Sequence, residues 1–116
     1  MAVKRVVPDL VAPEPTAGAT FYAEVLGLEK VMDLGWIATF AAPENPTAQI
    51  SVLRRDATAA VDPDVSIEVD DVDAAHAAAQ RLGCEILHPL TDEPWGVRRF
   101  FVRDPSGKVL NVLGHH

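Results

Sequence analysis

The chain has 116 residues, of which 48% are hydrophobic and 23% charged, and this length allows one globular domain with a hydrophobic core. No apolar segment approaches the roughly 20 residues that a membrane-spanning helix needs, so a soluble, cytoplasmic protein without a membrane partner is expected. The net charge of −7 disfavours binding to nucleic acid, and the single cysteine, Cys84, cannot form an internal disulfide.

The first half of the chain is predicted to contain a strand, a helix and three further strands. Residues 4–11 have the composition of a strand, and apolar residues at helical spacing predict a helix over 16–26 that ends at Gly27. The three strands that follow are predicted over 28–34, 36–41 and 48–54, with the turn Pro43-Glu44-Asn45-Pro46 before the last of them.

The second half repeats this order after a linker over 56–64. A strand over 65–69 precedes a helix that Asp70-Asp71-Val72-Asp73 opens and Gly83 ends. Strands are then predicted over 85–88, 97–103 and 109–113, with a tight turn at 104–107. The sequence Leu26-Gly27-Leu28-Glu29 resembles Leu82-Gly83-Cys84-Glu85 at the same helix-to-strand junction, which indicates a duplicated module. We expect one domain over 1–116, with module one at about 1–56 and module two at about 62–116.

Three segments carry a resemblance to a known family. Pro94 to Lys108 contains a P-W-G motif, basic residues, aromatic residues and a D-P-x-G turn, Phe21 to Leu28 reads F-Y-x-x-x-L-G-L, and Val69 to Ala74 opens the second helix. The chain therefore resembles the glyoxalase, bleomycin-resistance and extradiol-dioxygenase superfamily, also called vicinal oxygen chelate proteins, and in particular its bleomycin-resistance-like branch. The resemblance implies an α+β fold of two tandem βαβββ modules that form curved mixed sheets around a cavity, with the helices on the convex side, and it implies a homodimer.

Enzymes of this superfamily usually hold a divalent ion, and the resemblance assigns the ligand positions to Val7, Ser51, Asp64 and Asn111. Among these residues only Asp64 is a good ligand type, and Gln49 is the one alternative nearby. Surface or packing roles are expected for the four histidines, which are His76, His88, His115 and His116. Because no nucleophile motif or phosphate loop is present either, we expect no metal, no cofactor and no catalytic residue.

A ligand cavity without metal would be lined from the strand positions that share the inner face. Strand alternation and loop position select the following ten residues: Trp36, Trp95, Asp9, Gln49, Ser51, Asp64, Glu68, Arg99, Phe101 and Asn111. The two tryptophans are candidates for stacking on a planar or cationic ligand. Packing in the core or at a dimer interface explains Trp36 equally well, whereas the Pro-Trp-Gly loop favours contact of Trp95 with a ligand or an interface. The carboxylates suit a cation and Arg99 suits an anion, so the ligand charge stays open.

The residues favour a metal-independent protein that binds or sequesters a small organic molecule, for which an antibiotic is one candidate. The alternative is a metal-dependent lyase, isomerase or dioxygenase of the same fold with a degenerate site. A regulatory or scaffold dimer with an empty cavity is the third hypothesis.

Overall fold

The computed structural model describes residues 1–115, so His116 lies outside the described residues. Over this range the chain has an α+β fold, which confirms the predicted class. The elements in chain order are β1 (Val3–Val11), α1 (Ala19–Leu26), β2 (Glu29–Asp33), β3 (Ile37–Ala42), β4 (Asn45–Leu53), β5 (Val65–Val69), α2 (Val72–Arg81), β6 (Ile86–Asp92), β7 (Val97–Arg103) and β8 (Val109–His115). None of the helices in this range is long and apolar enough to cross a membrane.

The element order is βαβββ twice, as the duplicated sequence pattern predicts. Contacts within the chain define two compact units, one over Val7–Thr58 and the other comprising Met1–Val6 together with the described residues from Ala59 onward. We call them the first-module unit and the second-module unit. Strand β1 is divided between them, because its first residues belong to the second-module unit.

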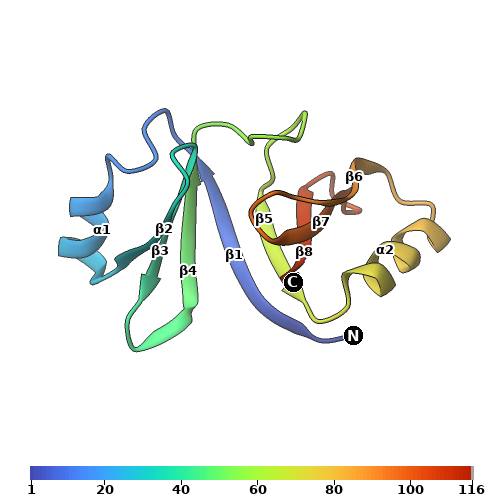
Figure 1. The fold of residues 1–116 in the computed structure, drawn as a ribbon, viewed down its shortest axis with the longest axis horizontal. Helices are drawn as coiled ribbons and strands as arrows, with labels where there is room; N and C mark the ends of the chain where they lie inside the picture. The colour runs from blue at the N-terminus through green and yellow to red at the C-terminus, as the bar shows by residue number, and fades with distance from the viewer. Residues whose placement is uncertain (116) are drawn as a thin grey trace. The chain divides into compact units, whose positions relative to one another are not determined.

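In the first-module unit the strands follow the order β2-β3-β4-β1, and α1 lies along one face of this sheet (Figure 1). Strand β4 pairs in parallel with β1 on one side and antiparallel with β3 on the other. The core beneath the helix contains Ala38, Phe40 and Val52, and the Tyr22 ring lies 5.0 Å from the Phe40 ring. Tyr22 thus packs against the core beneath the helix.

The turn before β4 is shorter than predicted. Strand β4 begins at Asn45, which pairs with Ala42, so Pro43 and Glu44 alone form the turn. A shift in pairing register between Ala41 and Ala42 accommodates Pro46, which has no backbone N–H to donate. The start of α1 is also later than predicted, because the segment before Ala19 forms turns.

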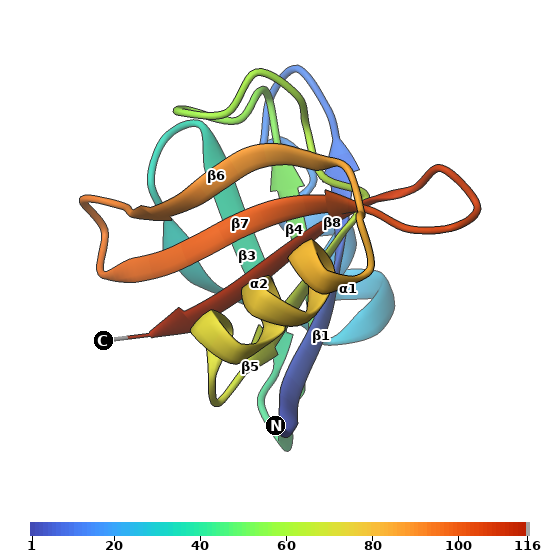
Figure 2. The same ribbon diagram turned by 90° about the vertical axis from the view of Figure 1, so that its right-hand side faces the viewer.

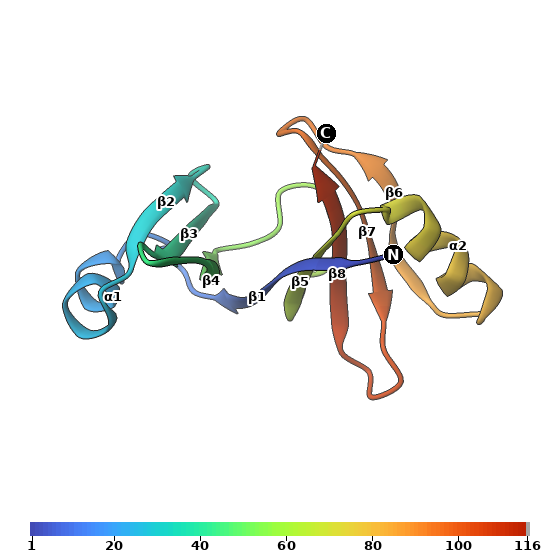
Figure 3. The ribbon, with the colours of Figure 1, turned by 90° about the horizontal axis from the view of Figure 1, so that it is seen from below.

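In the second-module unit the strand order is β1-β5-β8-β7-β6, and α2 covers one face of β7 and β8 (Figures 2 and 3). Strands β5 and β8 are parallel, whereas β7 and β8 form a regular antiparallel hairpin. The core between α2 and the sheet contains Val69, Val72, Phe100 and Val112, with Val102 packed against it. Phe100 and Val102 thus lie under a helix, as strand alternation predicts.

Strand β6 is longer than predicted, because it continues through Pro89 to Asp92. The predicted end of this strand at His88 is therefore wrong. Strand β6 is the last strand in the order, and its pairing with β7 shifts register on either side of His88. An irregular edge strand tolerates proline, since the missing N–H would not bond a neighbouring strand there.

Candidate functional site

The face of the second-module sheet that α2 leaves uncovered carries polar side chains at the positions predicted from strand alternation. Asn111 pairs with Phe101 on one side and with Ser66 on the other. Leu113 pairs in the same way with Arg99 and Glu68. Directly paired residues point to the same side of a sheet, so these side chains share the helix-free face, opposite to Phe100 and Val112.

A buried cluster of two charged side chains and a histidine lies on this face, and we call it the Glu93 cluster: Glu93, Arg99 and His88. The Arg99 Nε donates to Glu93 Oε2 at 2.6 Å, and His88 Nε2 lies 3.1 Å from the same oxygen. The side chains of Glu93 and Arg99 are only 3% and 4% exposed. Strand β6 positions His88, strand β7 positions Arg99, and the connection between them supplies Glu93.

Aromatic rings surround the Arg99 guanidinium. Its central carbon lies 5.1 Å from the centre of the Trp95 ring and 4.8 Å from that of Phe101, within the range of cation–π attraction. The His88 ring centre is 5.2 Å from that of Phe101. Trp95 thus stacks on a cation of its own chain, and together with Phe101 it forms an aromatic frame around the Glu93 cluster.

Two carboxylates that were predicted to attract a cation are engaged by the protein itself. Glu68 forms an ion pair with Arg5 at 3.0 Å and lies 2.9 Å from His115 Nδ1. Burial alone would raise the pKa of Glu68, but the hydrogen bond with His115 and the nearby positive charges outweigh it and lower this pKa. Asp64 is exposed, and its Oδ2 accepts a hydrogen bond of 2.8 Å from the backbone N–H of Val109.

Asn111 is buried on the same face and has one unsatisfied atom. Its Nδ2 donates to Ser66 Oγ at 3.0 Å, whereas its Oδ1 is buried and has no hydrogen-bond partner among residues 1–115. A buried acceptor without a donor costs about 1–3 kcal/mol, so this oxygen is a position at which a bound group could donate a hydrogen bond favourably.

The four positions implied by the family resemblance do not fit a divalent ion. Val7 has a hydrocarbon side chain, the Ser51 hydroxyl is hydrogen-bonded to Thr39 at 2.7 Å, and Asn111 offers only a neutral amide oxygen. Asp64 remains, and one carboxylate is too few for a site that needs three or four ligands. No group of three or more His, Cys, Asp or Glu side chains within residues 1–115 could hold a metal.

The remaining predicted residues belong to the first-module unit. Asp9 is buried on β1 beside Ser51, its pairing partner on β4. Gln49 is half-buried, and its Nε2 donates to the Pro46 carbonyl at 2.7 Å. Trp36 is half-buried just before β3. The other six predicted residues belong to the second-module unit: Asp64, Glu68, Trp95, Arg99, Phe101 and Asn111. A role in ligand binding remains a prediction for all ten residues.

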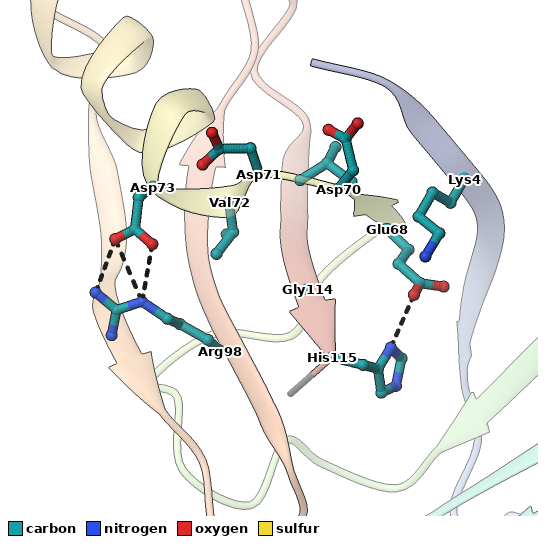
Figure 4. A pocket seen from close by; sticks show the side chains of 10 residues that line it. Lys4, Glu68, Asp70, Asp71, Val72, Asp73, Arg98, Gly114 and His115 are labelled. Carbon is teal, nitrogen blue, oxygen red and sulfur yellow. Dashed lines mark hydrogen bonds and ion pairs between the residues drawn. The ribbon is translucent and has the colours of Figure 1, made fainter.

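A separate shallow cavity of about 280 Å³ lies at the junction between β5 and α2 (Figure 4). Its wall includes Glu68 with its partner His115, and Arg98, which donates to Asp73 at 2.9 Å. The hydrogen bonds from Arg98 lower the pKa of Asp73. Within this wall Glu68 is thus paired with His115, and Asp73 is paired with Arg98.

Sequence reasoning missed Glu93 and ended the strand at His88, for which it predicted only a surface or packing role. The signal that could have found them is strand alternation continued through Pro89, because His88 pairs with Phe101, which was already assigned to the inner face. A proline was interpreted as the end of the strand, which is the more frequent outcome away from sheet edges.

Comparison with known proteins identifies the family to which the chain belongs. Residues 3–112 match the family model of the Glyoxalase/Bleomycin resistance protein/Dioxygenase superfamily, and the chain belongs to this superfamily. No curated protein matches the chain in sequence.

Several solved structures share the fold at low sequence identity. A glyoxalase/bleomycin resistance protein/dioxygenase superfamily member from Vibrio splendidus 12B01 has a TM-score of 0.70 at 16% identity, covering 97% of this chain and 99% of that one. Methylmalonyl-CoA epimerase from Mycobacterium tuberculosis has a TM-score of 0.69 at 16% identity, covering 98% and 87%. The Mn(II)-bound glyoxalase from Novosphingobium aromaticivorans has a TM-score of 0.65 at 24% identity, covering 97% and 38%.

Proposed function

We propose that the protein binds a small organic molecule without a metal, on the helix-free face of the second-module sheet. The observation that carries this proposal is the buried Glu93 cluster framed by Trp95 and Phe101. Burying a charged group costs several kcal/mol even when it is paired, and apolar packing of the kind seen under α2 would be less costly. Buried ionisable side chains beside aromatic rings, on a sheet face that no helix covers, are a common feature of ligand sites.

The chemistry of this face favours a planar ligand over a compact cation. Trp95 and Phe101 supply ring faces, Arg99 supplies a guanidinium, and Asn111 supplies a buried acceptor. The carboxylates of Glu68 and Glu93 are already paired with positive side chains. We propose sequestration of such a molecule as the biological role, and planar aromatic antibiotics are the first class to test.

Tryptophan fluorescence tests binding directly, since the chain has two tryptophans. The variant Trp36→Phe leaves Trp95 as the sole reporter, and the matched variant Trp95→Phe leaves only Trp36. A compound that binds at the Glu93 cluster should quench or shift the emission of Trp36→Phe in a saturable way, and should act less on Trp95→Phe. If no compound in a broad panel of planar aromatic acids, amides and antibiotics changes the Trp95 emission, the binding proposal is wrong.

Two of the similar structures are named as an epimerase and as a Mn(II)-bound glyoxalase, so metal-dependent catalysis is the competing function. Calorimetric titration with Mn²⁺, Ni²⁺, Zn²⁺ and Fe²⁺ separates the two functions. We expect no tight site in the full chain and none in a chain ending at Gly114, which lacks the two terminal histidines. One tight site per chain in both proteins would favour an enzyme with displaced ligands.

A further inference from the structure

The connection that precedes the helix differs between the two modules. In the second-module unit Asp70 and Asp71 alone separate β5 from α2, whereas residues 12–18 connect β1 to α1 (Figure 1). Because the duplicated unit folds with the shorter connection, the longer one is not a requirement of the fold. Connections on a rigid scaffold carry binding functions more often than the elements that they join. The β1–α1 connection is therefore a candidate for a role of its own.

This connection borders a cavity of about 310 Å³, which we call the α1 pocket. Its wall consists of the following residues from the connection, the helix and β4: Ala12, Pro13, Glu14, Pro15, Ala17, Gly18, Tyr22 and Val52. All of these residues belong to the first-module unit. The volume is at the lower end of the roughly 300–1,000 Å³ that small-molecule sites have, so the pocket suits a molecule built on a single aromatic ring.

The backbone holds the wall of the α1 pocket in one shape. Ala17 donates a backbone hydrogen bond of 3.1 Å to the carbonyl of Glu14, which closes a turn. Pro15 is buried in this turn and restricts its φ angle. Gly18 allows the close approach of Tyr22, because a Cβ atom at Gly18 would lie 3.1 Å from Cε2 of that ring. A recess that is formed in advance binds a ligand with a smaller loss of conformational entropy.

Two polar side chains of the wall are left over by the protein's own contacts. The Glu14 carboxylate is exposed and forms no ion pair or hydrogen bond within residues 1–115. The hydroxyl of Tyr22 also forms no hydrogen bond in that range, while its ring packs against Phe40 at 5.0 Å. Among the described residues, no Lys, Arg or His lines the pocket. The α1 pocket thus combines an apolar and aromatic surface with one uncompensated negative charge.

We propose that the α1 pocket binds a small organic ammonium ion, whose apolar or aromatic body fills the recess while its charge lies near Glu14. The carboxylate attracts the ammonium group, the face of the Tyr22 ring attracts cations, and the Tyr22 hydroxyl accepts a hydrogen bond from the ammonium N–H. An anion is repelled by Glu14 and by the net charge of −7. A neutral molecule of the same shape gains the apolar contact alone. The site is independent of the proposed ligand face, which lies in the second-module unit.

Phenethylamine is the probe for this site, and proton–nitrogen correlation NMR of the full chain shows where it binds. We expect saturable shifts of the backbone amide signals of Ala17, Gly18 and Tyr22. The dissociation constant should lie in the millimolar range, because the recess is small and partly open to solvent. Phenethyl alcohol has the same shape without the charge, and it should bind about twofold to fivefold more weakly, which is the contribution of one exposed ion pair. Hydrocinnamate, the matching anion, should bind more weakly still.

Three variants separate the carboxylate of the pocket from the net charge of the chain. Glu14→Gln should weaken phenethylamine binding about twofold to fivefold and leave the binding of phenethyl alcohol unchanged. Tyr22→Phe keeps the ring and removes the hydroxyl, and it should weaken the amine about threefold. Glu24→Gln is the matched control, because Glu24 is an exposed carboxylate of α1 that lies outside the wall. It changes the net charge by the same amount as Glu14→Gln and should leave the affinity unchanged.

Three results would overturn the proposal. Phenethylamine at tens of millimolar could shift no amide signal of the pocket wall, which would exclude binding there. The alcohol could bind as tightly as the amine, which would mean that the site does not recognise the charge. Finally, Glu24→Gln could weaken the amine as much as Glu14→Gln does, which would assign the effect to the overall charge of the chain. Tryptophan fluorescence with planar aromatic compounds tests the other site separately, so failure of one proposal leaves the other standing.

Discussion

Replacing Glu93 by Gln removes the negative charge from the buried cluster while keeping the shape of the side chain. Glu93 Oε2 accepts from Arg99 at 2.6 Å and lies 3.1 Å from His88 Nε2, and its side chain is 3% exposed. Without the carboxylate charge, the Arg99 guanidinium loses its strongest partner in this cluster. The cost of removing one member of a buried ion pair is about 3–5 kcal/mol.

We expect the lower end of this range for Glu93→Gln, because Arg99 also contacts the rings of Trp95 and Phe101. A loss of about 3 kcal/mol in a domain of this size lowers the melting temperature by about 10 °C. Thermal unfolding followed by circular dichroism measures this shift, and urea unfolding gives the free energy independently.

The matched control is Glu85→Gln. Glu85 pairs with Arg103 at 3.1 Å, but its side chain is 60% exposed, and an exposed pair contributes less than about 1 kcal/mol. If Glu93→Gln shifts the melting temperature no more than Glu85→Gln does, the cluster is not energetically coupled as the distances indicate. A cluster without this coupling would not support the proposed ligand site.

Three further predictions concern the core, a turn and the pH response. Phe100→Ala should cost about 3–5 kcal/mol in urea unfolding, because the fully buried ring fills the space under α2. Gly107→Ala should cost about 1 kcal/mol or more, since Gly107 has a φ of 89° in the β7–β8 turn; thermal unfolding would show it. The depressed pKa of Glu68 in the folded protein means that its stabilisation is present at neutral pH and is lost as the pH falls below about 4.5 and through the folded-state pKa. Glu68→Gln should therefore lose less stability than the wild type between pH 5 and pH 3, measured by urea unfolding at each pH.

The elements and their faces could be predicted because both depend on local spacing. Alternation along β7 is strict, so Phe100 and Val102 on one face and Arg99 and Phe101 on the other follow directly from the sequence. The glycines predicted to end the two helices, Gly27 and Gly83, both have a positive φ, as a left-handed residue after a helix requires. Element ends were less accurate where proline lies near an edge or a turn, as at Pro46 and Pro89.

The partners of the charged side chains could not be predicted, because they depend on contacts between distant parts of the chain. Arg5 pairs with Glu68, and Arg98 pairs with Asp73 twenty-five positions away. The sequence shows that Glu68 is on the inner face, but not that Arg5 and His115 neutralise it there. For the same reason the sequence does not show that the Trp95 ring lies against the Arg99 guanidinium, 5.1 Å from its central carbon.

Pairing of the charges on the second-module sheet changes what a ligand must supply. A cation that approached Glu68 or Glu93 would have to compete with Arg5 or Arg99, and each exchange would leave a positive side chain without its carboxylate. An uncharged donor meets no such competition at Asn111, where Oδ1 is buried without a hydrogen-bond partner in the described chain. A ligand whose amide N–H or hydroxyl donates to this oxygen, and whose ring packs against Trp95 or Phe101, would satisfy the buried acceptor without breaking an ion pair. If the proposed site is correct, it should therefore prefer neutral planar molecules that carry a hydrogen-bond donor over the cationic ligands that the excess of acidic residues would suggest.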